Sequence, residues 1–281
     1  MSVEKTFVDR MGVTIYFDVY TAKKARGVVL ILHGIGEHAG RYKHVAEALV
    51  SAGYTCYVPD QRGSGRTGMA QFGDVAKLGR LGAGGFRAAV ADITELTELI
   101  RRENAQLPLF LLGHSMGSLM GQIVANDRAG DYAGLIWSGT ASRTPSRMNA
   151  GDLNKKFAVP GGTGHEWLSR DPAVARAFAA DPWCFEAAVL KLYGVADGLR
   201  LYGRPARDMA RVPILIFIGS DDPLGGESSV LFLANDYITR SGQDDVTVTV
   251  YPGGRHEMFN ETNKTQVIDD VVSWLTEHTK S

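Results

Sequence analysis

The chain has 281 residues, of which 44% are hydrophobic and 22% are charged, and its formal net charge is -1. This length allows one large domain or two small ones with a sizeable core, and the composition is that of a globular protein. The near-neutral charge gives no electrostatic basis for binding nucleic acid, and no apolar run reaches the length of a membrane-spanning helix. Because the start also lacks the apolar core of a secretory leader, we expect a protein of the cytoplasm.

The N-terminal third alternates strand and helix patterns. Residues 5–20 predict two short strands, because apolar and polar side chains alternate around a turn at Gly12. Residues 27–32 and 54–59 are almost wholly apolar, which is typical of strands buried on both faces. Between them, residues 41–52 have the periodicity of a helix.

The same alternation continues through the middle of the chain and returns at its end. It predicts further strands at residues 107–112, 133–138, 212–218 and 246–251, and helices at residues 86–102, 116–127, 227–239 and 265–278. Strands that alternate with helices of this length favour a mostly parallel central sheet flanked by helices. The predicted fold class is therefore α/β.

The strand pattern stops between residues 141 and 208, where short helical patterns, prolines and aromatic residues occur. We interpret this stretch as a helical lid inserted after the sixth strand, over the sheet edge where ligands bind in open α/β sheets. The predicted organisation is a core of residues 1–140 and 209–281 with a lid of residues 141–208. The apolar residues of the lid would suit either the lining of a tunnel or transient contact with a lipid interface.

The sequence GHSMG at residues 113–117 lies between a predicted buried strand and a predicted helix. This is the context that a nucleophile elbow requires, because the tight turn lifts the serine hydroxyl above the sheet. Gly113 and Gly117 provide the small residues that such a turn needs, which makes Ser115 the candidate nucleophile.

A serine hydroxyl needs a base that removes its proton and an acid that orients the base. Of the seven histidines, His256 follows the last predicted strand, where a short loop would bring it over the sheet edge. The acid should follow a strand between the serine and the histidine, and Asp221 and Asp222 are both candidates there. The chain order Ser, Asp, His is the order expected of this arrangement.

Hydrolysis also needs donors for the oxyanion that forms on the acyl carbon. The elbow supplies the backbone N–H of Met116. The glycine-rich loop after residues 27–32 lies in the right place for a second donor, and Ile35 is the candidate.

Five motifs resemble the α/β-hydrolase superfamily, and within it the monoacylglycerol lipase and lysophospholipase group of serine aminopeptidase-type hydrolases. They are HGIGEH at residues 33–38, DQRGSG at 60–65, GHSMG at 113–117, GSDD at 219–222 and YPGGRHE at 251–257. The resemblance covers nearly the whole chain and implies the α/β-hydrolase fold.

The resemblance also implies roles for particular residues. It places the acid of a catalytic triad at Asp222 and leaves Asp221 as a turn or helix-capping residue. It places the oxyanion donors at Ile35 and Met116, and it puts Glu37 and Arg41 near the alcohol end of the substrate, although a structural ion pair would explain both equally well.

Three further residues receive weaker interpretations. Asp60 and Arg62 are interpreted as residues that order their loop. Trp183 stands where the group commonly has leucine, and a tryptophan there would narrow or shorten an acyl tunnel.

The predicted function is that of a serine carboxylic-ester hydrolase acting through an acyl-enzyme on monoacylglycerols, lysophospholipids or similar acyl esters. No metal or organic cofactor is expected, and Cys56 and Cys184 predict neither a disulfide framework nor a metal site. One alternative is a peptidase of the proline-iminopeptidase kind, which would hold a free amine with acids of the insertion: Asp152, Glu166, Asp171, Asp181 and Glu186. The other is a binding protein on a hydrolase scaffold.

Overall fold

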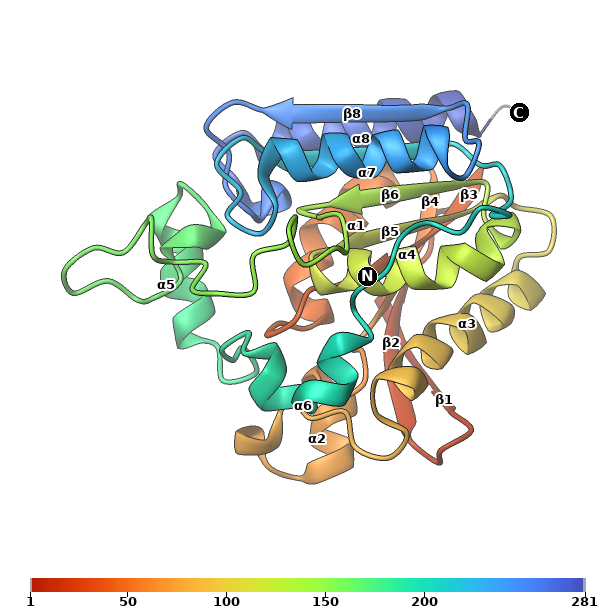
Figure 1. The fold of residues 1–281 in the computed structure, drawn as a ribbon. Helices are drawn as coiled ribbons and strands as arrows, with labels where there is room; N and C mark the ends of the chain where they lie inside the picture. Colours follow the sequence, from red (N-terminus) through yellow and green to blue (C-terminus); the bar gives the residue numbers. More distant parts are fainter. Residues whose placement is uncertain (1, 280–281) are drawn as a thin grey trace.

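The computed structural model describes residues 2–279, so the outermost residues of the predicted units 1–140 and 209–281 lie outside it. Within these residues the strands form one eight-stranded sheet in the order β1-β2-β4-β3-β5-β6-β7-β8 (Figure 1). The strands are β1 (Ser2–Val8), β2 (Thr14–Tyr20), β3 (Gly27–Leu32), β4 (Tyr54–Pro59), β5 (Leu109–His114), β6 (Gly134–Ser138), β7 (Ile214–Gly219) and β8 (Val246–Tyr251). The β1–β2 and β2–β4 pairs are antiparallel and all other neighbours are parallel, as the α/β prediction required.

Helices cover both faces of the sheet. They are α1 (Lys43–Ser51), α2 (Gly65–Phe72), α3 (Gly85–Glu103), α4 (Met116–Arg128), α5 (Pro172–Ala180), α6 (Val189–Leu199), α7 (Gly226–Thr239) and α8 (Lys264–His278). Side chains alternate between the faces of each strand, so Leu30 packs with α3, α4 and α7 whereas Val29 packs with α1 and α8. Burial on both faces explains why β3, β4, β5 and β7 have almost no polar residues.

Helix α2 differs from the sequence prediction, which placed no helix after residues 60–66. Two glycines, Gly65 and Gly68, hide its helical pattern because glycine disfavours helix interiors. Packing requires them: a Cβ on Gly68 would overlap the carbonyl group of Gly63, and one on Gly65 would overlap the carboxylate of Asp60. Close tertiary contact therefore decides this helix against local propensity.

The loop before α2 is ordered by the charged residues that the sequence assigned to this task. The Arg62 guanidinium is fully buried and pairs with Asp9 and Asp92. Asp60 accepts a hydrogen bond from the backbone N–H of Ala39 and pairs with Arg66. Both interpretations agree with the structure.

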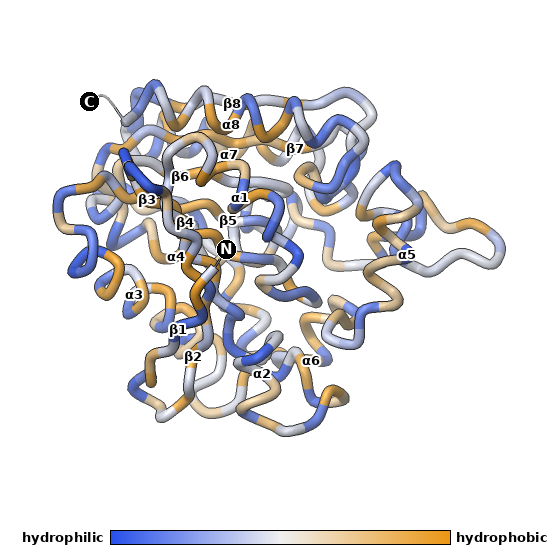
Figure 2. Tube along the Cα trace, turned by 180° about the vertical axis from the view of Figure 1, so that it is seen from behind, coloured by the Kyte–Doolittle hydropathy of each residue, from blue (hydrophilic) through white to orange (hydrophobic). Residues whose placement is uncertain are grey.

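The long segment between β6 and β7, residues 139–213, contains α5 and α6. Its α5 part lies beyond the carboxyl ends of β6 and β8, and the stretch after α6 returns to the start of β7 (Figure 1). Figure 2 shows that hydrophobic residues run through the middle of the molecule, and that this segment also contains hydrophobic stretches. No helix within residues 2–279 is long and apolar enough to cross a membrane.

Candidate active site

Ser115 stands at the turn between β5 and α4 with φ 50° and ψ -122°, and it is the only non-glycine residue at positive φ within residues 2–279. The turn is possible because neighbouring glycines allow close packing. A Cβ on Gly117 would overlap the carbonyl oxygen of Leu32, and one on Gly113 would overlap the backbone of Ser118. A strained dihedral of this kind costs about 1–3 kcal/mol and clusters at functional sites.

Replacing Ser115 by glycine should release this strain. We expect Ser115→Gly to be more stable than Ser115→Ala by about 1 kcal/mol, because glycine adopts positive φ without a Cβ penalty but loses more chain entropy. Urea unfolding of the two variants measures the difference. Ser273 in the middle of α8 is the matched control, and there glycine should be less stable than alanine by about 1 kcal/mol. If the glycine variant were less stable than the alanine variant at both positions, the strain at Ser115 would be contradicted.

The loops after β7 and β8 bring Asp222 and His256 together, as predicted. Both carboxylate oxygens of Asp222 lie 3.0 Å from Nδ1 of His256, and both side chains are almost fully buried. Asp221 points elsewhere: its carboxylate is half exposed and pairs with Lys156 at 2.9 Å. Asp221 lies in the turn after β7, which is one of the two roles predicted for it, and α7 has no side-chain cap at its N-terminus. This turn separates the two neighbouring aspartates.

The environment of His256 favours a basic imidazole. Burial by itself would lower its pKa, but the Asp222 carboxylate outweighs burial, and the pKa is raised above the ordinary value of 6.5. Asp222 accepts the hydrogen bond from Nδ1, so the proton of the neutral ring is on Nδ1. The other nitrogen, Nε2, is buried and has no hydrogen-bond partner among the described residues. It is therefore free to accept a proton.

Two rings flank this imidazole. His114 lies with its ring centre 4.8 Å from that of His256, and Trp167 lies at 4.7 Å. Burial, followed by the neighbouring His256, holds the pKa of His114 well below its ordinary value, so His114 remains neutral. The sequence did not predict that Trp167 packs against His256, because no pattern in the chain relates residue 167 to residue 256.

The glycine-rich loop after β3 is fixed by its own side chains. Nδ1 of His33 donates to the carbonyl of Gly34 at 2.6 Å, because Nε2 of His33 accepts from the N–H of Gln61. The N–H of Gly34 donates to Oε1 of Glu37 at 2.7 Å. Both peptide groups that flank Gly34 are thus held in place, and the next residue of the loop is Ile35.

Glu37 and Arg41 form a buried ionic network with Glu257. Nη1 of Arg41 lies 2.6 Å from Oε2 of Glu37, and the guanidinium makes two further bonds of 2.6 and 2.7 Å to Glu257. Burial alone would raise the pKa of Glu37, but Arg41 and the hydrogen bonds hold it below its usual value. The structural ion pair left open by the sequence is therefore present. Glu257, the residue after His256, had no assigned role.

Breaking this network should destabilise the fold. We expect Glu257→Gln to lower the free energy of unfolding by about 2 kcal/mol, because it removes charge-assisted hydrogen bonds to the buried Arg41, whose charge Glu37 still balances. Glu47→Gln is the matched control, because Glu47 is exposed and lies 3.9 Å from Lys43, so the change should be below about 0.5 kcal/mol. Denaturant unfolding measures both. A loss no larger than that of the control would show that the network contributes little.

A cavity of about 750 Å³ brings most of the predicted site residues together. Ser115, Met116, Ile35, Glu37 and His256 all line it. Its remaining wall is mostly apolar and comes from the segment between β6 and β7: Met148, Leu153, Trp167, Leu168, Phe178, Phe185, Val189, Leu190, Val195, Leu199 and Leu201. Volumes of this size are typical of sites for small organic ligands.

Two predicted substrate-binding residues do not line this cavity. Arg41 lies behind Glu37 and Glu257, with its guanidinium 5.0 Å from the Phe178 ring centre, and its place is structural. Trp183 packs edge-on against His38, with ring centres 5.4 Å apart. The expectation that Trp183 narrows the tunnel is therefore corrected. The Trp183 ring contacts His38 instead, while Phe178 and Phe185 line the cavity.

Two groups of described side chains could supply metal ligands. One consists of Glu37, His114 and Glu257, and the other of His38, Asp181 and Cys184. The first group already contains a cation, because the Arg41 guanidinium is ion-paired with both of its glutamates. No organic cofactor is needed for the chemistry that the site suggests.

A strand-to-helix serine at positive φ, a buried Asp–His pair on later loops and a mostly parallel sheet define an α/β-hydrolase. The family model described as "Serine aminopeptidase, S33" matches residues 23–263. The chain belongs to this family, and it is a hydrolase.

Relatives cover nearly the whole chain. It is 33% identical to a monoacylglycerol lipase of Mycolicibacterium smegmatis, over 98% of this chain and 97% of that protein. It is 26% identical to a monoglyceride lipase of Mus musculus, over 89% of this chain and 82% of the relative. A highly thermostable carboxyl esterase from Bacillus coagulans, solved in complex with glycerol, superimposes with a TM-score of 0.84 at 25% identity, covering 99% of both chains.

Proposed function

We propose that the protein is a serine carboxylic-ester hydrolase that cleaves monoacylglycerols or similar acyl esters through an acyl-enzyme. The observation that carries this proposal is the buried Asp222–His256 pair, whose unpaired Nε2 belongs to the same apolar cavity as the strained Ser115. A nucleophile and a base that line one cavity, with an orienting acid behind the base, are what acyl transfer requires.

In the first half of the reaction, Nε2 of His256 removes the hydroxyl proton of Ser115 while Oγ attacks the ester carbonyl. Asp222 keeps the ring proton on Nδ1 and stabilises the imidazolium that forms. The backbone N–H groups of Ile35 and Met116 hold the oxyanion, and His33 and Glu37 keep the loop of Ile35 rigid. Preorganised donors of this kind contribute roughly 3 kcal/mol each.

The imidazolium of His256 then gives its proton to the leaving alcohol, and the acyl group stays on Ser115. In the second half, His256 takes a proton from water, which attacks the acyl-enzyme and releases the acid. This sequence needs no cofactor.

The apolar wall favours an alkyl chain as the acyl part of the substrate. We interpret residues 141–208 as a lid, because α5, α6 and the turns around them supply most of that wall. Related proteins named monoacylglycerol lipase and monoglyceride lipase support a glycerol ester in particular. Phe178 and Phe185 line the cavity, which favours a tunnel lining over contact with a lipid interface as the role of these aromatic residues.

A peptidase that holds a free amine is less well supported, because most acids of the insertion already have partners. Asp171 caps α5, Asp181 pairs with His38, and Glu166 accepts hydrogen bonds from Thr163 and Asn154. Only Asp152 and Glu186 of the five candidates line the cavity. No arrangement there is suited to a substrate ammonium group.

The deciding experiment is fatty-acid release from monoacylglycerols of increasing chain length, lysophospholipids, short synthetic esters and aminoacyl amides. Serine-dependent release that peaks on a medium or long monoacylglycerol supports the proposal, with Ser115→Ala as the blank. Release from aminoacyl amides alone would replace it by the peptidase, and no serine-dependent release from any substrate would favour a binding protein.

The pH dependence should report the state of His256. Because its pKa is raised above 6.5, kcat/KM should fall on the acid side through a pKa above that value and stay high as pH rises past it. In Glu257→Gln the acid limb should move to lower pH, since the Glu257 charge also raises this pKa. Initial rates on a neutral ester between pH 5 and about 9 measure both profiles. An acid limb that moves upward in the variant would contradict the assignment.

A further inference from the structure

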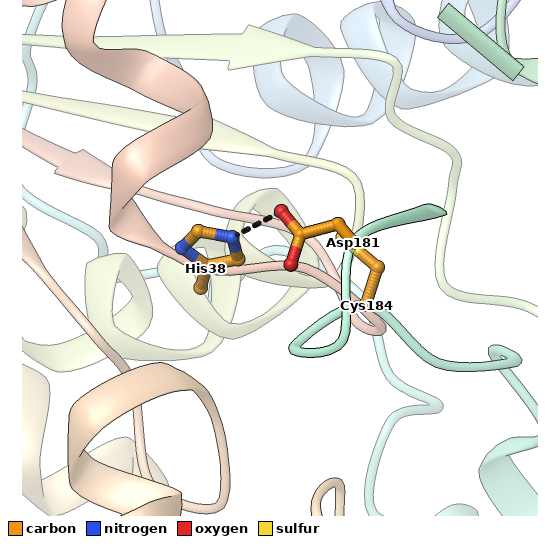
Figure 3. Close-up of side chains that lie close together, drawn as sticks. All are labelled: His38, Asp181 and Cys184. Atoms are coloured by element: carbon orange, nitrogen blue, oxygen red, sulfur yellow. Dashed lines mark hydrogen bonds and ion pairs between the residues drawn. The ribbon is translucent and has the colours of Figure 1, made fainter. Parts of the chain in front are cut away.

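A second cluster of chemically reactive side chains lies outside the proposed active site. His38 stands in the loop after β3, and Asp181 and Cys184 stand in the turn after α5 (Figure 3). Nε2 of His38 lies 2.9 Å from Oδ2 of Asp181, and the possible ligand atoms of the three residues all lie within 4.8 Å of one another. The cluster therefore connects the loop after β3 with the segment of residues 139–213, which lines the cavity.

The three side chains offer one nitrogen, one oxygen and one sulfur ligand. Zinc and related divalent ions bind imidazole, carboxylate and thiolate at about 2.0–2.3 Å, which places neighbouring ligands about 3.3–3.8 Å apart. The geometry points to a binding site for a divalent cation of the zinc class, held by His38, Asp181 and Cys184 with water as the fourth ligand. Side-chain rotations that shorten the longest separation by about 1 Å complete the coordination.

The charges around the cluster leave room for a cation. The group of Glu37, His114 and Glu257 already has Arg41 at its centre. Asp181, by contrast, pairs with no lysine or arginine in the part of the chain that the structure describes, and its only ionic partner there is His38. Arg41 acts on this carboxylate only from a distance, and a divalent ion would supply a direct ionic partner.

The two segments are already held in register. The N–H of Phe185 donates to the carbonyl of Gly36 at 3.0 Å, and a Cβ on Gly36 would overlap the carbonyl of Phe185. The N–H of Cys184 donates to the carbonyl of Asp181 at 3.1 Å, and this turn keeps the two residues close together. The Asp181 carboxylate is 31% exposed, so an ion reaches it from solvent.

Binding of the metal would release one proton to solvent, from the Cys184 thiol, while His38 keeps its ring proton. The metal takes the lone pair of Nε2 while the ring proton moves to Nδ1, which gives up its contact with the N–H of Gly40. The Cys184 thiol releases its proton to solvent and binds as thiolate. Burial raises the pKa of this thiol to about 12, so the metal-free protein carries it protonated.

The test is titration of the untagged, reduced protein with Co²⁺ alone, because cobalt bound to thiolate gives a charge-transfer band in the near ultraviolet. We expect a saturable band with one equivalent of cobalt, displaced by Zn²⁺. Cys184→Ser should abolish the band, and His38→Gln and Asp181→Asn should each weaken cobalt binding by at least about tenfold. Cys56→Ala is the matched control and should retain the band, since Cys56 is buried in the core.

Circular dichroism of each variant shows that it is folded. A band that survives Cys184→Ser, disappears in folded Cys56→Ala, or never saturates in the wild-type protein would overturn the proposal. The readout does not depend on hydrolysis, so it is independent of the proposed function.

Discussion

Ser115→Ala is expected to lower kcat/KM for ester hydrolysis by at least about 10⁴-fold, because it removes the hydroxyl oxygen that would form the proposed acyl-enzyme. The alanine keeps the elbow geometry, since it has the same Cβ and the same backbone at positive φ. Stopped assays on a monoacylglycerol measure the loss, and the melting temperature shows that the fold is intact.

The control is Ser118→Ala, three residues further along α4. Ser118 is more deeply buried than Ser115, and its hydroxyl donates to the carbonyl oxygen of Ser115 at 2.6 Å, but it does not line the cavity. We expect this variant to keep activity within about tenfold of wild type, as for a residue that only supports the turn. Comparable losses in both variants would mean that the elbow, rather than the Ser115 hydroxyl, was disturbed.

Asp222→Asn is expected to lower kcat by about 10⁴-fold, because an amide would allow the wrong tautomer of His256 and leave its positive charge unsupported. The variant keeps the shape of the side chain, and Oδ1 can still accept from the N–H of Leu224. Steady-state rates at a pH well above the His256 pKa separate this effect from simple protonation.

Asp221→Asn is the control offered by the chain itself. Its carboxylate pairs with the exposed Lys156, and such a surface pair contributes less than about 1 kcal/mol. We expect a change in kcat of less than about threefold, within the range of a surface substitution. A ranking in which Asp221→Asn is the more damaging change would refute the choice of acid.

Elements that depend on short-range pattern were predicted closely. Strands β3, β4 and β8 begin and end at the predicted residues, and α3 and α4 extend the prediction by one residue at one or both ends. The apolar runs of β3 and β4 reflect burial on both faces of the sheet, whereas the edge strand β8 alternates valine and threonine. The elbow belongs to the same class, because strand, turn and helix are contiguous.

Features that depend on contact between distant segments were missed or misassigned. Helix α2 is formed by packing against Gly63 and Asp60, although its glycines disfavour a helix. The neighbours Trp183 and Phe185 differ in position because the turn after α5 aims one at His38 and the other at the cavity. No periodicity encodes that choice.

The sequence by itself determined the α/β order of elements and the elbow at Ser115, since each is set by contiguous residues, and the resemblance of its motifs placed the acid at Asp222. Only the tertiary structure decided that Asp221 pairs with Lys156, that Glu257 joins Glu37 around Arg41, and that Asp181 meets His38 across 143 residues. The physical reason is that loops at one edge of a parallel sheet converge in space whatever their separation along the chain, and side-chain direction is set by the packing around them.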